Sequence, residues 1–441
     1  MRVVTAPPLA GNVEAKPPTC RRVVLAFPQT SYRVEAYLLA AERLGIELFL
    51  ATDMADAAAR FDRRAVVVDF ANLEEGAASI VSRGPFDGVI ATSEESAVMV
   101  ARVCAELGLP HHDVEGARAA EDKCRMRERL LRAGFGAPSF RVLERDDSPE
   151  RIAALVRFPC VVKPPMLSGS QGVIRANDAS ELRAAIARVR ALLGFHRKSL
   201  GAGDRFFRLL IEDYLPGDEI AVEALMDRGS LQAICVFDKP DPLLGPFFEE
   251  TIYVTPSRLP PPTIARALDV TARAARALGL VHGPIHAELR VHEGEASILE
   301  IAARTIGGLC SRVLELTTGS LEELLLSHAI GTVPPCTSMS SNTPSSSGVM
   351  MMPIARSGIL RAVHGLEAAR IVACVSDVVV SVALGQTLRA LPEGSTYLGF
   401  IFARGDSPEQ VERALRESFT ELRFDVSPLL PMACSLATQP D

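Results

Sequence analysis

The chain has 441 residues, a formal net charge of −7, and 48% hydrophobic residues. A chain of this length predicts two to four domains, and the acidic balance argues against a general nucleic-acid-binding protein. The nine cysteines are scattered without a Cys-x-x-Cys pair, which favours a reducing, cytoplasmic setting and gives no cysteine-based zinc motif. No uncharged apolar run reaches the roughly 20 residues of a membrane helix, so we expect no membrane association.

The N-terminal part predicts a parallel α/β domain over residues 20–117, preceded by a flexible tail over 1–19. Strands that alternate with helices form parallel sheets, which bind ligands at the carboxyl ends of their strands. The turn after the first strand has no Gly-x-Gly-x-x-Gly, so a dinucleotide-binding fingerprint is absent. The expected strands are 22–27, 46–51, 65–70 and 87–91, and the expected helices are 32–44 and 93–107.

The central part, residues 118–331, mixes helices and strands. We expect Lys123 in the first half of a helix and Lys163 at the end of a strand. A Pro-rich segment over 238–262 is expected to be a loop, and part of it suits a lid over a substrate pocket. The expected helices are 118–132, 263–278 and 321–330, and the expected strands are 158–163, 209–214, 219–226 and 231–237.

The C-terminal part begins with a Pro-, Thr- and Ser-rich segment over 332–348, which predicts a linker or a mobile surface loop. Residues 349–430 predict a small α+β domain, and 431–441 a second tail. The expected elements of that domain are strands at 358–364, 375–382 and 399–404 and a helix at 407–421.

Two alternating segments, 285–292 and 296–304, flank a turn signal at Glu293-Gly294-Glu295 and predict a β-hairpin. With a three-residue loop His292 faces Ala296, and we expect Glu288 opposite Glu300. Cross-strand neighbours lie roughly 5 Å apart, and two carboxylates at that distance repel unless a cation lies between them. Oxygen ligands from carboxylates, completed by substrate phosphates, are the usual ligands of Mg²⁺. A solvated hairpin with ordinary surface glutamates is the alternative.

Other groups suited to phosphate binding accompany the hairpin. Lys123, Lys163 and Arg304 can neutralise phosphate charge, and the small residues over 168–172 let backbone N–H groups approach phosphate oxygens. The acidic strand end over 212–219 can bind a nucleoside through its backbone and carboxylates. For Lys123, Lys163, Glu219 and Glu223, a solvated surface position is the alternative.

Two histidines, His282 and His286, flank Gly283-Pro284. They lie on a turn and a strand rather than on one helix face. We therefore expect them to serve packing or the substrate pocket rather than to bind a metal.

The order of these motifs resembles the ATP-grasp superfamily over about residues 20–430. The narrower resemblance is to carboxylate–amine ligases of the L-amino-acid ligase, or dipeptide synthase, type. It depends on Glu300-Ile-Ala-Ala-Arg304 and on Tyr397-Leu-Gly-Phe-Ile-Phe-Ala-Arg404. It implies an α/β and α+β architecture, in which an ATP-grasp domain over 118–331, with a mobile lid lobe at about 158–215, joins the two outer domains. The segments that carry the superfamily resemblance are 121–138, 159–173, 211–223 and 288–308.

The resemblance also implies roles for individual residues. Catalysis is assigned to Arg304, Glu300 and Glu288, and the last two are the metal ligands. Substrate contacts are assigned to Gly307, Gly308, His286 and Glu223. The ATP-binding residues would be Lys123, Lys163, Ser168, Gly169, Ser170, Gln171, Gly172, Glu212, Asp213, Tyr214, Leu215 and Glu219.

The implied reaction joins a carboxylate, expected to be an amino acid, to an amine through an acyl phosphate. It needs ATP and Mg²⁺ (or Mn²⁺), and its partners are small molecules. Many ATP-grasp enzymes have an Asn ligand where this chain has Ala302, which leaves the number of metal ions open. An ATP-grasp carboxylase, a purine-pathway-type ligase and a nucleotide-binding pseudoenzyme remain alternatives. The oligomeric state is also open, a homodimer included.

Overall fold

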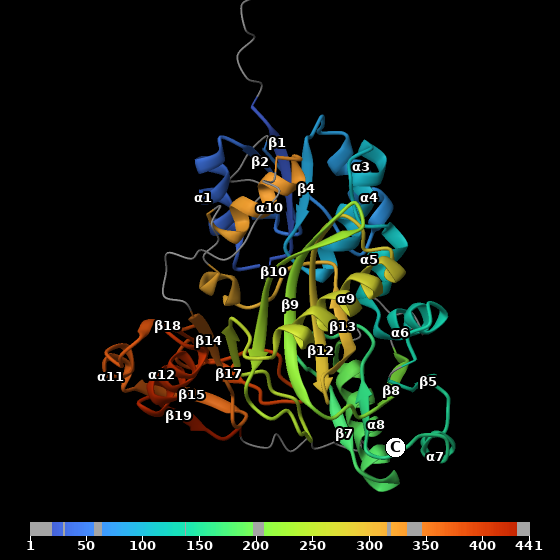
Figure 1. Cartoon of the computed structure of the whole chain (residues 1–441), viewed down its shortest axis with the longest axis vertical. Helices are drawn as coiled ribbons and strands as arrows, with labels where there is room; N and C mark the ends of the chain where they lie inside the picture. The colour runs from blue at the N-terminus through green and yellow to red at the C-terminus, as the bar shows by residue number, and fades with distance from the viewer. Residues whose placement is uncertain are drawn as a thin grey trace, which may run out of the picture.

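The computed structural model describes residues 20–29, 31–56, 64–136, 138–196, 207–314, 319–332 and 346–429. The tails expected over 1–19 and 431–441 lie outside these ranges. Figure 1 shows the N-terminal domain at the top, a lobe in green at the lower right and the C-terminal domain in orange and red at the lower left. No helix within the described ranges is both long and apolar enough to cross a membrane.

The N-terminal domain is the expected parallel sheet, with strand order β3-β2-β1-β4. Its strands are β1 (Arg22–Phe27), β2 (Glu47–Thr52), β3 (Ala65–Val67) and β4 (Gly88–Ala91). Its helices are α1 (Val34–Leu44), α3 (Leu73–Val81) and α4 (Glu94–Leu107), and Ser93 caps α4 as a helix N-cap serine does. The third strand ends at Val67, three residues earlier than expected.

The helix expected over 118–132 is interrupted at Asp122. Helix α5 (Val114–Glu121) ends there and α6 (Lys123–Arg132) begins. The Asp122 side chain accepts hydrogen bonds from the N–H groups of Cys124 and Arg125, which caps α6. Lys123 is therefore the first residue of a helix, not a residue in the first half of a longer one.

The lobe over residues 138–213 is a four-stranded antiparallel sheet of order β5-β8-β6-β7. Helices α7 and α8 pack with this sheet around one apolar core. Its elements are β5 (Phe140–Leu143), α7 (Pro149–Ala153), β6 (Cys160–Lys163), β7 (Ile174–Ala176), α8 (Ala179–His196) and β8 (Leu209–Asp213).

An eight-stranded sheet of order β13-β12-β9-β10-β11-β14-β18-β16 joins the central and C-terminal parts. The connection is the pairing of β11 with β14, in which Ile252 faces Met350. Strand β11 lies inside the segment expected to be a loop, and β14 takes up the last three residues of the expected linker, so both expectations were wrong there. The central elements are β9 (Asp218–Asp227), β10 (Ser230–Lys239), β11 (Ile252–Thr255), α9 (Pro261–Leu278), β12 (Gly283–His292), β13 (Glu295–Ala302), a 3-10 turn η3 (Cys310–Val313) and α10 (Leu321–Ala329).

The C-terminal domain adds a second sheet of order β17-β15-β19 and helix α12, which covers β14 and β18. Its α+β character agrees with the expectation. Its elements are β14 (Ser346–Met352), β15 (Gly358–His364), α11 (Leu366–Arg370), β16 (Val375–Val380), β17 (Thr387–Leu388), β18 (Gly399–Gly405), α12 (Pro408–Thr420) and β19 (Arg423–Ser427).

Helix α10 follows the central sheet in the chain but lies against the N-terminal domain, between α1 and β4 (Figure 1). A Cβ atom on Gly88 of β4 would lie 2.7 Å from the carbonyl oxygen of Ala329, so this close approach requires glycine. Glu322 of α10 also forms a buried ion pair with Arg33, with 2.7 Å between Arg33 Nη2 and Glu322 Oε1. The helix thus fixes the N-terminal domain on the central sheet.

Candidate active site

The hairpin of β12 and β13 places Glu288 opposite Glu300, as the sequence predicts. The route to that register differs from the expectation. The loop is Glu293-Gly294 alone, both residues have positive φ (51° and 80°), and His292 therefore faces Glu295 instead of Ala296. An irregularity beside Leu289 then lets β13 carry one extra residue, Leu299, which restores the Glu288–Glu300 pair.

Glu288 belongs to a buried cluster around the ammonium group of Lys239. The Lys239 Nζ atom lies 2.6 Å from Glu219, 2.9 Å from Glu288 and 3.1 Å from Glu250. One oxygen from each of these three carboxylates lies within 4.8 Å of the others. Burial and the charge of Glu288 raise the pKa of Glu250 to about 7, against the opposing effect of Lys239. Arg290 at Glu219 and His286 at Glu288 supply further positive charge, and the oxygen donors of the cluster suit a hard divalent cation.

Glu300 pairs with Lys123 instead, at 3.0 Å between Oε1 and Nζ. Burial alone would lower the pKa of Lys123, but Glu300 and Glu94 outweigh it and raise the pKa. The same ammonium group donates to the carbonyl oxygen of Leu167, at 2.8 Å. Lys123 thus connects the glutamate hairpin to the residue that precedes the 168–172 loop.

Lys163, at the end of β6, lies 2.6 Å from Glu212 of β8. The Arg127 guanidinium also pairs with Glu212, and it donates to the carbonyl oxygens of Ile298 and Leu299 at 2.8 and 2.7 Å. Glu212 is 2% exposed. Burial opposes its ionisation, but the charges of Arg127 and Lys163 prevail and lower its pKa to about 2. Arg127 therefore couples the lobe to the irregular part of β13.

The loop over 168–172 contacts the C-terminal domain. The Gln171 side chain donates to the carbonyl oxygen of Glu393 at 2.6 Å, and the Gly172 N–H donates to that of Pro392 at 2.9 Å. Ser168 and Gly169 at its tip are exposed, and Gly169, Ser170 and Gly172 all have positive φ. The Gln171 amide is thus engaged with the domain opposite, while the tip is open to a ligand.

The strand end expected to bind adenine is divided between two faces of β8. Glu212 faces the two cations, whereas Asp213 pairs with Arg157 on the other face, as alternation requires. Tyr214 follows the strand, and its backbone N–H donates to the carbonyl oxygen of Pro159. The Arg175 guanidinium lies over the Tyr214 ring, with Cζ 4.3 Å from the ring centroid. The Asp213 side chain therefore lies away from Lys163. Leu215 is half-buried.

Glu223 is fully buried and bonds to two protein groups, and the substrate contact that the resemblance implied stays a prediction. One of its oxygens bonds to Nδ1 of His286, and the other accepts the N–H of Ile306 at 3.0 Å. Burial alone would lower the pKa of His286, but Glu223 and Glu288 raise it to about 9. Glu223 thus orients a charged histidine and the loop that continues to Gly307, which is exposed, and Gly308, which is half-buried.

Arg304 forms an ion pair with Glu94, the first residue of α4, and donates to the carbonyl oxygen of Thr305 at 2.9 Å. Burial alone would lower the pKa of Arg304, but Glu94 raises it, so the guanidinium stays charged. The N-terminal domain therefore contributes a carboxylate to the site. A helix N-terminus also favours a negative group at that position.

Sequence reasoning missed four site residues: the buried Lys239 and Arg127, and the partly buried Glu250 and Glu94. Lys239 and Glu250 lie in or beside the segment expected to be a loop. One signal was available for Lys239, because it ends an apolar strand in the same way as Lys163. Glu94 and Arg127 reach their partners across domain boundaries, which no local pattern indicates.

Three family matches follow one another along the chain. Residues 38–111 match the ATP-grasp N-terminal domain, 156–313 the ATP-grasp domain, and 350–427 the L-amino acid ligase C-terminal domain 2. The chain therefore belongs to the ATP-grasp family. Within that family, its C-terminal domain is of the L-amino acid ligase kind.

Similar proteins agree with this placement. A crystal structure of L-amino acid ligase from Bacillus licheniformis superposes with a TM-score of 0.73 at 26% identity, covering 93% of this chain and 100% of that one. An uncharacterized protein of Sinorhizobium fredii is 26% identical over 95% of this chain and 86% of its own length. Alanine–anticapsin ligase of Bacillus subtilis is 27% identical over 50% of this chain, and carnosine synthase 1 of Gallus gallus is 29% identical over 64%. The chain spans only 49% and 32% of the lengths of these last two.

Proposed function

We propose that this protein is an ATP-dependent ligase that joins the carboxylate of an amino acid to an amine and releases ADP and phosphate. The observation that carries the proposal is that three lysines, two buried and one partly buried, each have a carboxylate partner at the site: Lys123 with Glu300, Lys239 with Glu288, and the partly buried Lys163 with Glu212. The phosphates of ATP would replace carboxylates as partners of the lysines. Similarity to amino-acid ligases supports the choice of substrate class.

Magnesium fits the donor set, because carboxylate oxygens converge beside a glutamate whose pKa is raised to about 7. We assign Glu288, a member of that cluster, and Glu300, which faces it across the hairpin, as its ligands, and a bound Mg²⁺ would neutralise phosphate charge. Lys123, Lys163 and Lys239 would bind the phosphates, and the 168–172 loop would cover them. The nucleoside would lie at the end of β8, near Tyr214, Leu215 and Glu219.

The reaction would proceed in two steps. A carboxylate oxygen of the first amino acid attacks the γ-phosphorus, the bond to the β-phosphate oxygen breaks, and ADP and an acyl phosphate form. The amine of the second substrate then attacks the acyl carbon, loses a proton, and inorganic phosphate leaves. Arg304 and the backbone N–H groups of Gly307 and Gly308 would stabilise the oxyanion of the tetrahedral intermediate. The lid lobe excludes water that would hydrolyse the acyl phosphate.

The test is a pooled amino-acid assay with ATP and Mg²⁺, read as ADP release and as new dipeptide masses. Glu300→Ala serves as the blank. We expect both signals from the wild type and neither from the blank. ADP release without any carboxylate–amine product, or equal release by the blank, would contradict the proposal.

A further inference from the structure

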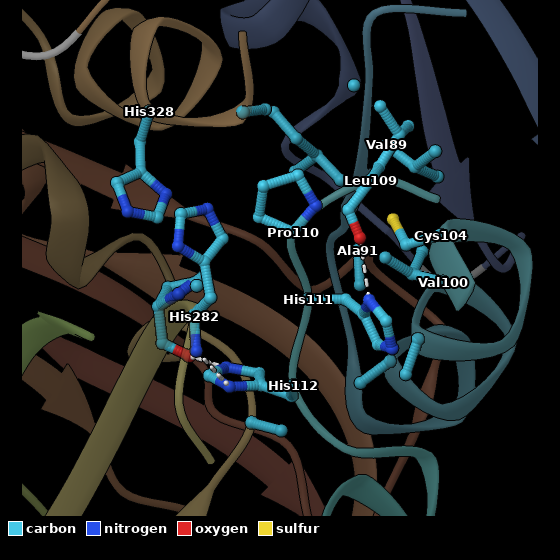
Figure 2. A pocket seen from close by; sticks show the side chains of 18 of the residues that line it. Val89, Ala91, Val100, Cys104, Leu109, Pro110, His111, His112, His282 and His328 are labelled. Atoms are coloured by element: carbon cyan, nitrogen blue, oxygen red, sulfur yellow. Dashed lines mark hydrogen bonds between the residues drawn. The ribbon is translucent and has the colours of Figure 1, made fainter. Parts of the chain in front are cut away.

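A second group of metal-ligating side chains lies where the N-terminal domain meets the central sheet, apart from the proposed ATP site. Asp227, His282 and His328 each offer one ligand atom, and these atoms all lie within 4.8 Å of one another. They come from three separate elements: the end of β9, the connection from α9 to β12, and the last turn of α10. Figure 2 shows the rings of His282 and His328 side by side at one end of a pocket.

The spacing of these groups approaches that of ligands around one ion. Asp227 Oδ1 lies 3.2 Å from His282 Nδ1, and the rings of His282 and His328 stack with centroids 4.3 Å apart. Zinc bonds of about 2.0–2.1 Å in a tetrahedron place neighbouring ligand atoms roughly 3.3–3.4 Å apart. The first pair already has this separation, and the stacked rings must turn toward a common point for His328 to reach it.

The protein itself leaves these nitrogens unsatisfied. His328 is 6% exposed, and its Nε2 atom is buried without a hydrogen-bond partner. His282 Nδ1 is also buried, and it lies beside Asp227 without the alignment of a hydrogen bond. Because a buried polar atom without a partner is costly, each such atom calls for an explanation. A metal ion on these lone pairs provides one.

The surroundings leave room for a further ligand. A cavity of about 60 Å³, lined by His282, His328 and apolar groups such as Val89, adjoins the cluster. That volume admits water molecules, and zinc sites with three protein ligands commonly take water in the fourth position. His112 is not that ligand, because its Nδ1 accepts the N–H of His282 and its Nε2 bonds to the carbonyl oxygen of Pro284. The charge of Arg228, which acts on His282, opposes a cation and must be outweighed by the three ligands.

We propose that Asp227, His282 and His328 bind one Zn²⁺ ion. Two imidazoles and one carboxylate suit this borderline-soft ion better than Mg²⁺. The ion would tie β9 and the start of β12 to α10, the helix that holds the N-terminal domain through Gly88 and Glu322. Its role is therefore that of a structural pin between domains.

Cobalt titration of the full-length, metal-stripped chain without nucleotide tests the site. We expect one Co²⁺ per chain to give the visible absorption of a tetrahedral nitrogen–oxygen site, and one equivalent of Zn²⁺ to abolish it. His328→Gln should weaken cobalt binding at least 10-fold. His111→Gln, which changes another histidine lining the same cavity, and Glu288→Gln, in the carboxylate cluster, should both leave it unchanged.

Asp227→Asn separates the loss of a ligand from a folding defect. The Asp227 side chain is 43% exposed, so replacing it disturbs the fold less than replacing the buried His328. Zinc should raise the melting temperature of the wild type and of His111→Gln by several degrees, and that of Asp227→Asn much less. The proposal is overturned if the wild type gives no such absorption, or if His328→Gln or Asp227→Asn retains wild-type cobalt affinity.

Discussion

The two ends of strand β9 hold two different clusters of charged and polar groups. Glu219 and Asp227 share one face of the strand by alternation and lie about 26 Å apart along it. Around Glu219 the donors are carboxylates, and Lys239 and Arg290 supply positive charge at 2.6 and 3.1 Å. Around Asp227 the donors are two imidazoles, and each has one buried nitrogen without a hydrogen-bond partner. The two ends of one strand face thus meet different donors: carboxylates at the proposed ATP site, and imidazoles from other elements at the domain interface.

The largest expected effect is on catalysis at the oxygen-rich end. Glu288→Gln should lower kcat for ADP formation by about 10³-fold, the scale of losing one group that stabilises transition-state charge. Steady-state kinetics measures this. The matched control is Glu295→Gln on the same hairpin, whose side chain is 82% exposed. A Glu288→Gln enzyme within 10-fold of the wild type would remove the proposed metal ligand from the mechanism.

The second effect concerns the charge balance that Lys239 provides. Lys239→Met removes the cation that three carboxylates, one buried and two partly buried, share, leaves them only Arg290 and His286, and should lower the free energy of unfolding by about 4 kcal/mol. Millimolar Mg²⁺ should restore part of that loss, because the ion takes over the neutralising role. Urea unfolding with and without Mg²⁺ measures both the loss of stability and the part of it that Mg²⁺ restores.

Lys163→Met is the control for this magnesium effect. Glu212, the partner of Lys163, keeps Arg127 after the substitution, so stability should not respond to Mg²⁺. Equal magnesium responses in the two variants would show that the Lys239 cluster has no special affinity for the ion.

A third effect is the pH dependence that Glu212 contributes. Its pKa is lowered to about 2 in the fold, against about 4.3 for an unperturbed glutamate. A lowered folded pKa gives stability that is present above pH 4.3 and is lost as the pH falls toward 2. Glu212→Gln should therefore cost about 3 kcal/mol near neutral pH. In urea unfolding, the difference between the variant and the wild type in the free energy of unfolding should narrow between pH 4 and pH 2.

Asp213→Asn serves as the neighbouring comparison, because its partner Arg157 is 76% exposed and such pairs contribute little. A constant difference between Glu212→Gln and the wild type across this pH range would show that the carboxylate charge is not the source of the stability.

The smallest effect is expected where helix α8, beside the 168–172 loop, meets the C-terminal domain. Arg188 and Glu393 form a two-point ion pair at 2.6 and 2.9 Å, but both side chains are partly exposed. Glu393→Gln should cost less than 1 kcal/mol and raise the KM for ATP about twofold, with kcat unchanged. Arg183→Gln on the exposed face of the same helix should change neither. A large fall in kcat would mean that closure of the lid is rate-limiting.

The sequence predicted those parts of the molecule that depend on local pattern. Alternation around Glu293-Gly294 identified the hairpin and the Glu288–Glu300 pair, although the loop length was wrong and Leu299 compensates for it. The break before Lys123 was also open to prediction, because aspartate favours the helix N-cap position that Asp122 occupies.

Contacts between distant segments could not be predicted from local sequence patterns. Strand β11 is only four residues long in a Pro-rich segment and depends on β14, far along the chain, for its pairing. The Glu94–Arg304 pair joins separate domains. His282 was expected to serve packing or substrate binding, since Asp227 and His328 converge on it only in the fold.

The most direct test of the proposed ligase chemistry follows carboxyl oxygen. Amino acids labelled with ¹⁸O in the carboxylate are supplied with ATP and Mg²⁺, and the released phosphate is examined by ³¹P NMR. An acyl phosphate intermediate predicts one ¹⁸O atom in the phosphate for each amide bond formed, together with ADP. Unlabelled phosphate, or AMP and pyrophosphate as products, would contradict it.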